Sequence, residues 1–261
     1  METDDLLELA DDPRFISGIH NYCDRWCERC PFSARCMVYA VEQADEDDDP
    51  ESRDINNKKF WDRLQGIFQQ TAELMRRWAE ENGISLDEIA LEAAKQERES
   101  ARKAARESDL ARAADAYVKR VEDWFNEHEA RLSAAGQPAT DLATAAEDDD
   151  QNEVREAAAV IRWYQFLIAV KLRRGLMQID DDEEETGFQK DSDGSVKVSL
   201  IGIDRSIGAW GNLERHLGED AGIRPVLLHL ERLRRNAEHS FPNARGFIRP
   251  GFDEGLDGPV S

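Results

Sequence analysis

The chain has little of what membrane, secreted or disulfide-stabilised proteins depend on. Its longest apolar run, near residues 160–170, is interrupted by Arg162 and is shorter than the ~20 residues of a membrane-spanning helix. The first residues, METDDLLELADD, are acidic and lack the basic start and apolar stretch of a secretory signal. Only four of the 261 residues are cysteine, and a chain of this length needs no disulfides for stability. We therefore expect a cytoplasmic protein without a membrane partner, whose thiols stay reduced.

Familiar catalytic motifs are also missing. The sequence contains no His-Glu-x-x-His, Gly-x-Ser-x-Gly, phosphate-loop or Gly-x-Gly-x-x-Gly pattern. A diiron bundle needs Glu-x-x-His pairs, and the histidines beyond residue 100 have no glutamate three residues before them: His128, His216, His229 and His239. Whether the chain is an enzyme stays open, and these motifs assign no catalytic residue.

Negative charge is abundant but concentrated. The net charge is −22, and three acidic runs at 45–51, 147–150 and 180–185 hold sixteen of the acidic residues. The remaining 40 acidic residues against 34 lysines and arginines give only −6. Blocks of like charge stay solvated and resist packing, which predicts connections at these runs. The acidic balance disfavours nucleic acid as a partner and leaves an unknown protein partner open.

Apolar residues recur about every 3.6 positions along most of the chain, which predicts an all-α protein. The only candidate strand, residues 196–203, is interpreted as helix. An exposed helix over 85–107 begins with a capping box at residues 85–88. About five long core helices are expected to form an antiparallel bundle, over residues 60–82, 110–132, 154–176, 193–217 and 225–237.

The predicted domain organisation follows from these patterns. Residues 1–44 form an N-terminal segment with a short helix around 4–10, and residues 45–55 form an acidic linker. The helical bundle spans 56–243, with acidic connections near 147–150 and 180–185. The glycine-rich residues 244–261 are expected to form a loose tail.

All four cysteines lie in the run YCDRWCERCPFSARC, at Cys23, Cys27, Cys30 and Cys36. Random placement would crowd them into 14 residues with a probability of about 0.0006, so the pattern indicates metal or redox chemistry. A zinc site usually has two close pairs separated by a dozen or more residues, and that separation is missing. An iron–sulfur cluster can take its thiolates from one loop. The four cysteines are therefore predicted to ligate a cluster, with 4Fe-4S favoured and structural zinc as the alternative.

The surroundings of the cysteines fit an anionic site. Residues 13–41 contain four arginines but only two acidic residues, so the local charge is positive. The arginines are Arg14, Arg25, Arg29 and Arg35, and the acidic residues are Asp24 and Glu28. Aromatic side chains are expected to shield the site from water: Tyr22, Trp26, Phe32 and Tyr39. His20, three residues before Cys23, is expected at the surface or behind the ligands rather than as a ligand.

Two family resemblances follow from these cysteines. Cys23, Cys27 and Cys30 resemble the Cys-x3-Cys-x2-Cys motif of radical S-adenosylmethionine enzymes, in which three thiolates hold a four-iron cluster. That match covers eight residues, and the chain lacks the βα alternation of the family's partial barrel. The whole run resembles more closely a one-loop ferredoxin segment, from whose spacing the x3, x2, x5 order departs. Either resemblance implies an iron–sulfur cofactor, and neither establishes an enzyme. We expect such a cluster to serve electron transfer, redox sensing or structure.

A second hypothesis comes from Arg234 and His239. Their Arg-x4-His spacing resembles the Arg-x4-to-6-His motif of HEPN ribonuclease domains, which are helical bundles. The resemblance implies that the arginine stabilises phosphate charge while the histidine moves a proton. The competing interpretation is a solvated basic helix end, which also suits the helix dipole.

Overall fold

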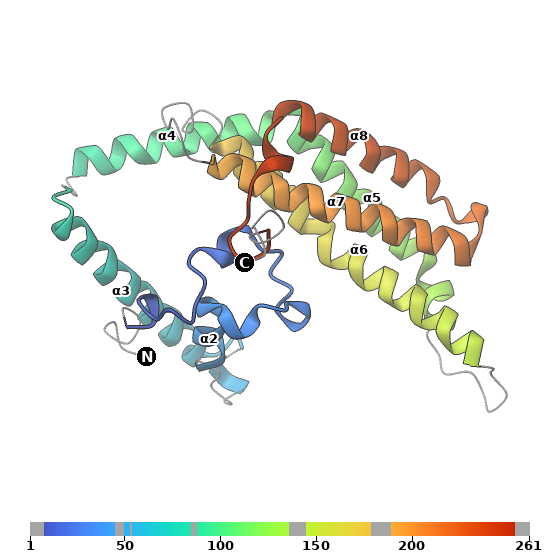
Figure 1. The fold of residues 1–261 in the computed structure, drawn as a ribbon, viewed down its shortest axis with the longest axis horizontal. Helices are drawn as coiled ribbons and strands as arrows, with labels where there is room; N and C mark the ends of the chain where they lie inside the picture. Colours follow the sequence, from blue (N-terminus) through green and yellow to red (C-terminus); the bar gives the residue numbers. More distant parts are fainter. Residues whose placement is uncertain are drawn as a thin grey trace, which may run out of the picture. The chain divides into compact units, whose positions relative to one another are not determined.

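The computed structural model describes residues 8–44, 50–52, 54–84, 88–135, 145–178 and 189–253. These residues form helices and connecting turns without any strand, which confirms the predicted all-α class (Figure 1). Residues 196–203 lie inside helix α7 (Asp191–Leu217), as expected. No helix in the described ranges is both long and apolar enough to cross a membrane.

The remaining α-helices are α2 (Met37–Ala44), α3 (Lys58–Glu81), α4 (Glu88–Glu107), α5 (Asp109–Ala135), α6 (Ala145–Met177) and α8 (Arg224–Ser240). Local chemistry explains several of their first residues. The Asn57 side chain accepts a hydrogen bond from the Lys59 amide at the start of α3. Ser108 does the same for Ala111 at the start of α5. Such caps satisfy amides that have no partner within the helix.

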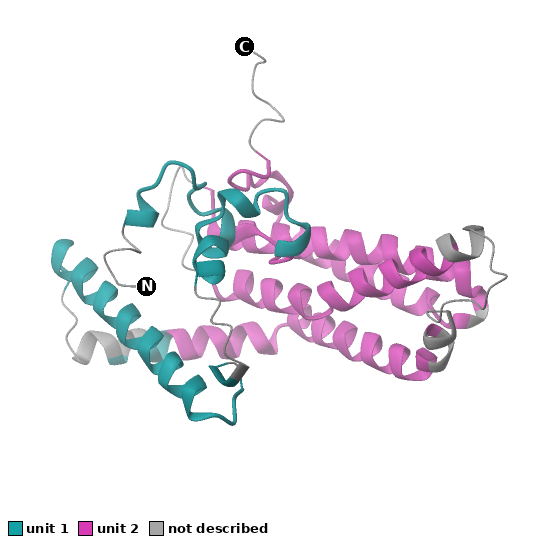
Figure 2. Ribbon diagram, turned by 90° about the horizontal axis from the view of Figure 1, so that it is seen from below, with its two compact units in different colours: residues 1–20, 27–97 teal, residues 21–26, 98–261 magenta. Residues whose placement is uncertain are grey.

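The chain divides into two compact units (Figure 2). Unit 1 comprises Met1–His20 and Cys27–Glu97, and unit 2 comprises Asn21–Trp26 and Arg98–Ser261. In unit 2, α5 packs against α6 and α8, and α7 packs against the same two helices. Successive helices from α5 to α8 run in opposite directions (Figure 1). Their buried faces form one apolar core.

Helices α6 and α7 approach each other closely because of a glycine. A Cβ atom added at Gly202 would lie 2.8 Å from Cδ1 of Tyr164 and 3.2 Å from Cγ1 of Ile168. The Ser199 hydroxyl donates to the Ile168 carbonyl oxygen at 3.1 Å across the same contact. This close contact fixes the side chains of α6 and α7 that contact residues 21–26 of the same unit.

The apolar face of α3 departs from the prediction of five core helices. Within the described residues, the apolar core of unit 2 contains side chains from α5 to α8, and the buried residue of α3, Ala79, lies outside it. Large apolar side chains of α3 are exposed to solvent: Trp61, Ile67, Phe68, Met75 and Trp78. Hydrophobic periodicity shows that a helix has an apolar face but not what covers it.

The three acidic runs, all predicted to be connections, differ in how the structure describes them. Residues 147–150 lie within α6 rather than in a connection. The acidic residues 45–49 and 180–185 lie outside the described residues, as do residues 85–87 of the expected capping box. The expected helix around residues 4–10 is described only over 8–10, which are helical.

Residues 244–253 are held in place, contrary to the expectation of a loose tail from residue 244. The Gln189 amide donates to the Ile248 carbonyl oxygen at 3.2 Å. Asp253 forms ion pairs with Lys197 of α7 at 2.9 Å and with Arg249 at 3.0 Å. A glycine-rich composition predicted mobility, but these long-range side-chain contacts outweigh it. Residues 254–261 lie outside the described residues.

Candidate metal centre

The four cysteines occupy short turns between Ile19 and Met37. Cys23 follows η1 (Ile19–Tyr22), Cys27 begins η2 (Cys27–Arg29), and Cys30 comes directly after it. Cys36 ends η3 (Ser33–Arg35) and immediately precedes α2. None of the four thiols forms a disulfide, and all four are half-buried. They are therefore available for metal ligation rather than consumed by disulfides.

Two of the sulfur atoms accept hydrogen bonds from the backbone. The amide of Phe32 donates to Sγ of Cys30 at 3.4 Å. The amide of Arg25 interacts in the same way with Cys23, again two residues further along the chain. Arg25 has a φ of 59°, in the left-handed region that non-glycine residues rarely adopt. Amides directed at sulfur stabilise thiolates and tune the reduction potential of iron–sulfur clusters.

The segment that carries Cys23 is fixed to unit 2 by Asp24. The Asp24 carboxylate accepts hydrogen bonds from the Tyr164 hydroxyl and, at 2.7 Å, from Nη1 of Arg205. Its carbonyl oxygen accepts from Nε1 of Trp163 at 3.0 Å. Next to it, the Trp26 ring stacks on Trp163 with 4.7 Å between ring centroids. Residues 24–26 are thus held by α6 and α7.

Tyr22 fixes the other end of the same segment. Its hydroxyl donates to Asp191 at 2.5 Å, and its ring lies 4.6 Å from that of Phe247. Gly194 makes this possible, since an added Cβ atom there would lie 2.4 Å from the Tyr22 ring. Tyr22 and Trp26 were expected to shield a metal site, and in the structure they anchor the segment to the helices.

A buried lysine lies close to Cys23. Nζ of Lys171 in α6 donates to the carbonyl oxygen of Asn21 at 2.9 Å. Burial raises the pKa of the Cys23 thiol, and the Arg25 amide together with the positive charges of Arg25 and Lys171 oppose that rise. Burial also lowers the pKa of Lys171, and the charge of Arg174 adds to this effect. Burial has the largest effect, so the pKa of the Cys23 thiol is raised overall although Arg25 and Lys171 place positive charge beside it.

The other predicted residues have separate surroundings. Arg14 forms an ion pair with Asp12 at 2.6 Å, and Arg35 donates to the Arg14 carbonyl oxygen at 3.5 Å. His20 lies in η1, and Arg29 lies in η2. Of the four arginines expected near the site, Arg25 is the one whose charge acts on a cysteine in unit 2.

The cysteines are not gathered into a finished ligand set. Over the residues that the structure describes, no three or more histidine, cysteine, aspartate or glutamate side chains are grouped so that they could hold a metal ion. The division into compact units falls within the motif, with Cys23 in unit 2 and the other three cysteines in unit 1. The metal centre therefore stays a prediction, resting on the spacing and on the local surroundings of each sulfur.

The Arg234 and His239 pair gains no support from the geometry. Arg234 is engaged by Glu231 at 2.7 Å and Asp204 at 3.3 Å, whereas His239 is exposed. Five residues of an α-helix turn through about 140°, so the two side chains leave α8 in different directions. This arrangement suits the solvated basic helix end better than joint action on one phosphodiester.

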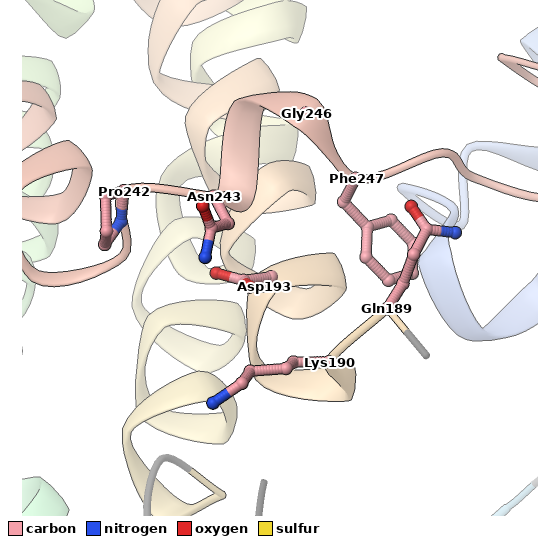
Figure 3. A pocket seen from close by; sticks show the side chains of 7 residues that line it. All are labelled: Gln189, Lys190, Asp193, Pro242, Asn243, Gly246 and Phe247. Carbon is pink, nitrogen blue, oxygen red and sulfur yellow. The ribbon is translucent and has the colours of Figure 1, made fainter. Parts of the chain in front are cut away.

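A pocket of about 550 Å³ opens at the N-terminal end of α7 in unit 2. Its lining comes from the start of α7 and from the segment after α8: Gln189, Lys190, Asp193, Pro242, Asn243, Gly246 and Phe247. The polar ends of Asp193 and Asn243 point toward one another (Figure 3). These seven residues include neither cysteine nor histidine, so the pocket offers no ligands of the kind that hold an iron–sulfur cluster.

Comparisons with known proteins add no family. The chain matches no protein-family model, no curated protein and no solved structure. Sequence reasoning overlooked Lys171, Tyr164 and Arg205, which lie far along the chain from the cysteines. No local motif marks them, because they meet the cysteine segment only after α6 and α7 have packed.

Proposed function

We propose that Cys23, Cys27, Cys30 and Cys36 ligate a 4Fe-4S cluster that serves electron transfer, redox sensing or structure. The observation that carries the proposal is the presence of every cysteine of the chain within 14 residues. In this proposal residues 1–44 are a small metal-binding segment that precedes a helical bundle. The four thiols are half-buried and form no disulfides, which is consistent with that role.

Local electrostatics favour an anionic group at these cysteines. Four thiolates leave a site with residual negative charge after metal binding, and positive groups stabilise it. Arg25 and Lys171 supply such charge beside Cys23. The amides that point at Cys23 and Cys30 act in the same direction. A buried lysine is costly unless it serves a partner, and a cluster thiolate is a suitable one.

A structural zinc site is the alternative. The same four thiolates could bind one zinc ion tetrahedrally, and the helices would then form a protein-interaction module. The spacing weighs against this alternative, because the two close cysteine pairs of a usual zinc site are not separated here. The two possibilities differ in colour, metal content and sulfide content.

Anaerobic purification of the full chain separates them. We expect brown protein with about four iron atoms and four labile sulfides per chain, as a cubane ligated by four cysteines requires. Cys27→Ser should lose most of this iron and sulfide, whereas the matched control Ser33→Ala in the same run should retain them. Colourless protein with one zinc per chain, or iron retained in Cys27→Ser, would show that the cluster assignment is wrong.

A further inference from the structure

One side of α3 carries a regular apolar stripe in unit 1. Its members are spaced alternately by three and four residues: Trp61, Leu64, Phe68, Thr71, Met75 and Trp78. This is the a and d pattern of a heptad repeat, which pairs helices along a narrow seam. Ile67 and Leu74 widen the stripe on one flank. We refer to the six residues with heptad spacing as the α3 stripe.

The α3 stripe is open to solvent to a degree that needs an explanation. Trp61, Phe68, Met75 and Trp78 are 53%, 63%, 62% and 58% exposed. Single exposed apolar residues are common on protein surfaces, but a contiguous row of large ones marks an interaction site. Tryptophan, phenylalanine and methionine are enriched in the cores of interfaces, and tryptophan is among the residue types that contribute most to binding energy.

We propose that the α3 stripe joins two copies of this chain, with their α3 helices side by side and antiparallel. The register of the stripe is symmetric in this arrangement. When Trp61 lies opposite Trp78 of the second copy, Leu64 lies opposite Met75 and Phe68 lies opposite Thr71. A two-fold interface requires such self-complementarity, because each residue pair must occur twice.

The charges at the ends of α3 favour a second copy of the same helix as the partner, and they favour the antiparallel direction. The first turn contains Lys58 and Lys59 and no acidic residue, and the last turn contains Glu80 and Glu81 and no basic residue. This distribution opposes the dipole of the helix itself, which favours acids at the first turn and bases at the last. An antiparallel copy brings the lysine end of each helix to the glutamate end of the other. A parallel copy would instead bring like charges together.

Both lysines already form ion pairs within the chain, but these pairs are exposed to solvent. Lys58 pairs with Asp62 at 2.6 Å and Lys59 with Glu51 at 2.8 Å, and more than half of each of these four side chains is exposed. Exposed pairs of this kind contribute little to stability and exchange readily. They do not prevent the lysines from turning to the second copy. The proposal stands apart from the cysteine centre and uses none of its residues.

The first test is sedimentation equilibrium of the full chain, with Phe68→Glu as the disrupting variant. The wild-type protein should have about twice the monomer mass of 29.7 kDa. Phe68→Glu should weaken association at least about 30-fold, as expected for a central interface residue. Leu228→Glu is the matched control, since Leu228 is a similarly exposed apolar residue on α8. It should remain dimeric, and both variants should keep the wild-type circular dichroism.

Charge reversal tests the direction of the helices. Lys58→Glu with Lys59→Glu should weaken the dimer, and adding Glu80→Lys with Glu81→Lys should restore it. A dimer that the first pair leaves unchanged would contradict the antiparallel arrangement. A wild-type monomer at concentrations up to about 100 µM, or a dimer unaffected by Phe68→Glu, would overturn the proposal. A monomer whose α3 amides resist hydrogen exchange would show that the chain itself covers the stripe.

Discussion

Replacing Tyr164 by phenylalanine should loosen the attachment of the cysteine segment. The Tyr164 side chain is fully buried, and its hydroxyl donates to the Asp24 carboxylate while accepting from Arg205. Burial and the charge of Asp24 raise the pKa of this hydroxyl well above its usual range, so it remains a donor at neutral pH. Tyr164→Phe removes the donor without removing the ring that packs in the core.

The expected loss can be worked out from the remaining contacts. A hydrogen bond to a charged acceptor is worth about 1.5–3 kcal/mol. The Arg205 side chain is 55% exposed and stays paired with Asp24 at 2.7 Å in the variant, so solvent and the remaining ion pair compensate in part. We expect a loss of about 1–2 kcal/mol in the free energy of unfolding, or a decrease of about 2–6 °C in Tm.

Urea denaturation and hydrogen exchange measure this effect. Exchange of the amides at residues 24–26 should accelerate in Tyr164→Phe, because the segment loses one of its attachments to α6. The control is Tyr39→Phe in α2, which removes a hydroxyl from a helix of unit 1 and should change stability by less than about 0.5 kcal/mol. If the two variants have the same stability and the same exchange rates, Tyr164 does not hold the segment.

Three further substitutions test the packing, the C-terminal segment and the surroundings of Cys23. Gly202→Ala should destabilise the protein by about 1–3 kcal/mol, because the new methyl group meets α6; the open Gly208→Ala on the same helix should instead stabilise it by about 0.5–1 kcal/mol in chemical denaturation. Burial works against ionisation of Asp253, but hydrogen bonds from Arg249 and Lys197 outweigh it and hold the pKa of Asp253 well below its usual range. Because the pKa of Asp253 is lower in the folded than in the unfolded state, its ion pairs stabilise the fold fully only above about pH 4. The loss of stability in Asp253→Asn should therefore be largest above that pH and should shrink as the pH falls below it. A loss that is the same at every pH would contradict this role. In the cluster-loaded protein, Lys171→Met should make the reduction potential more negative, since it removes a positive charge near Cys23; an anaerobic redox titration that gives the wild-type potential would exclude an effect of Lys171 on the cluster.

The helices of unit 2 could be predicted because their signals are local. Periodic apolar positions predict helices over residues 110–132, 154–176, 193–217 and 225–237, and the structure has helices there. Whether the apolar face of α3 is buried could not be predicted in the same way. Its apolar stripe has the same period as those of the core helices, and only packing decides which stripes are buried.

The four candidate ligands could be chosen from the sequence, but their surroundings could not be predicted. Four cysteines in one short run are visible in any reading of the sequence. Asp24 meets Tyr164 and Arg205 across 140 and 181 positions, and no short-range pattern encodes such contacts. Tyr22 and Trp26 stand out in the sequence as aromatic residues beside Cys23 and Cys27, but their role as anchors depends on residues far along the chain.

The central claim is that these four cysteines together hold one 4Fe-4S cluster. Native mass spectrometry of the anaerobically purified full chain tests it most directly, because the mass added to the polypeptide identifies the bound group. The account predicts one species per chain that carries four irons and four sulfides and that is lost in Cys27→Ser. A chain that carries a single zinc ion, or no bound inorganic group after reconstitution with iron and sulfide, would contradict it.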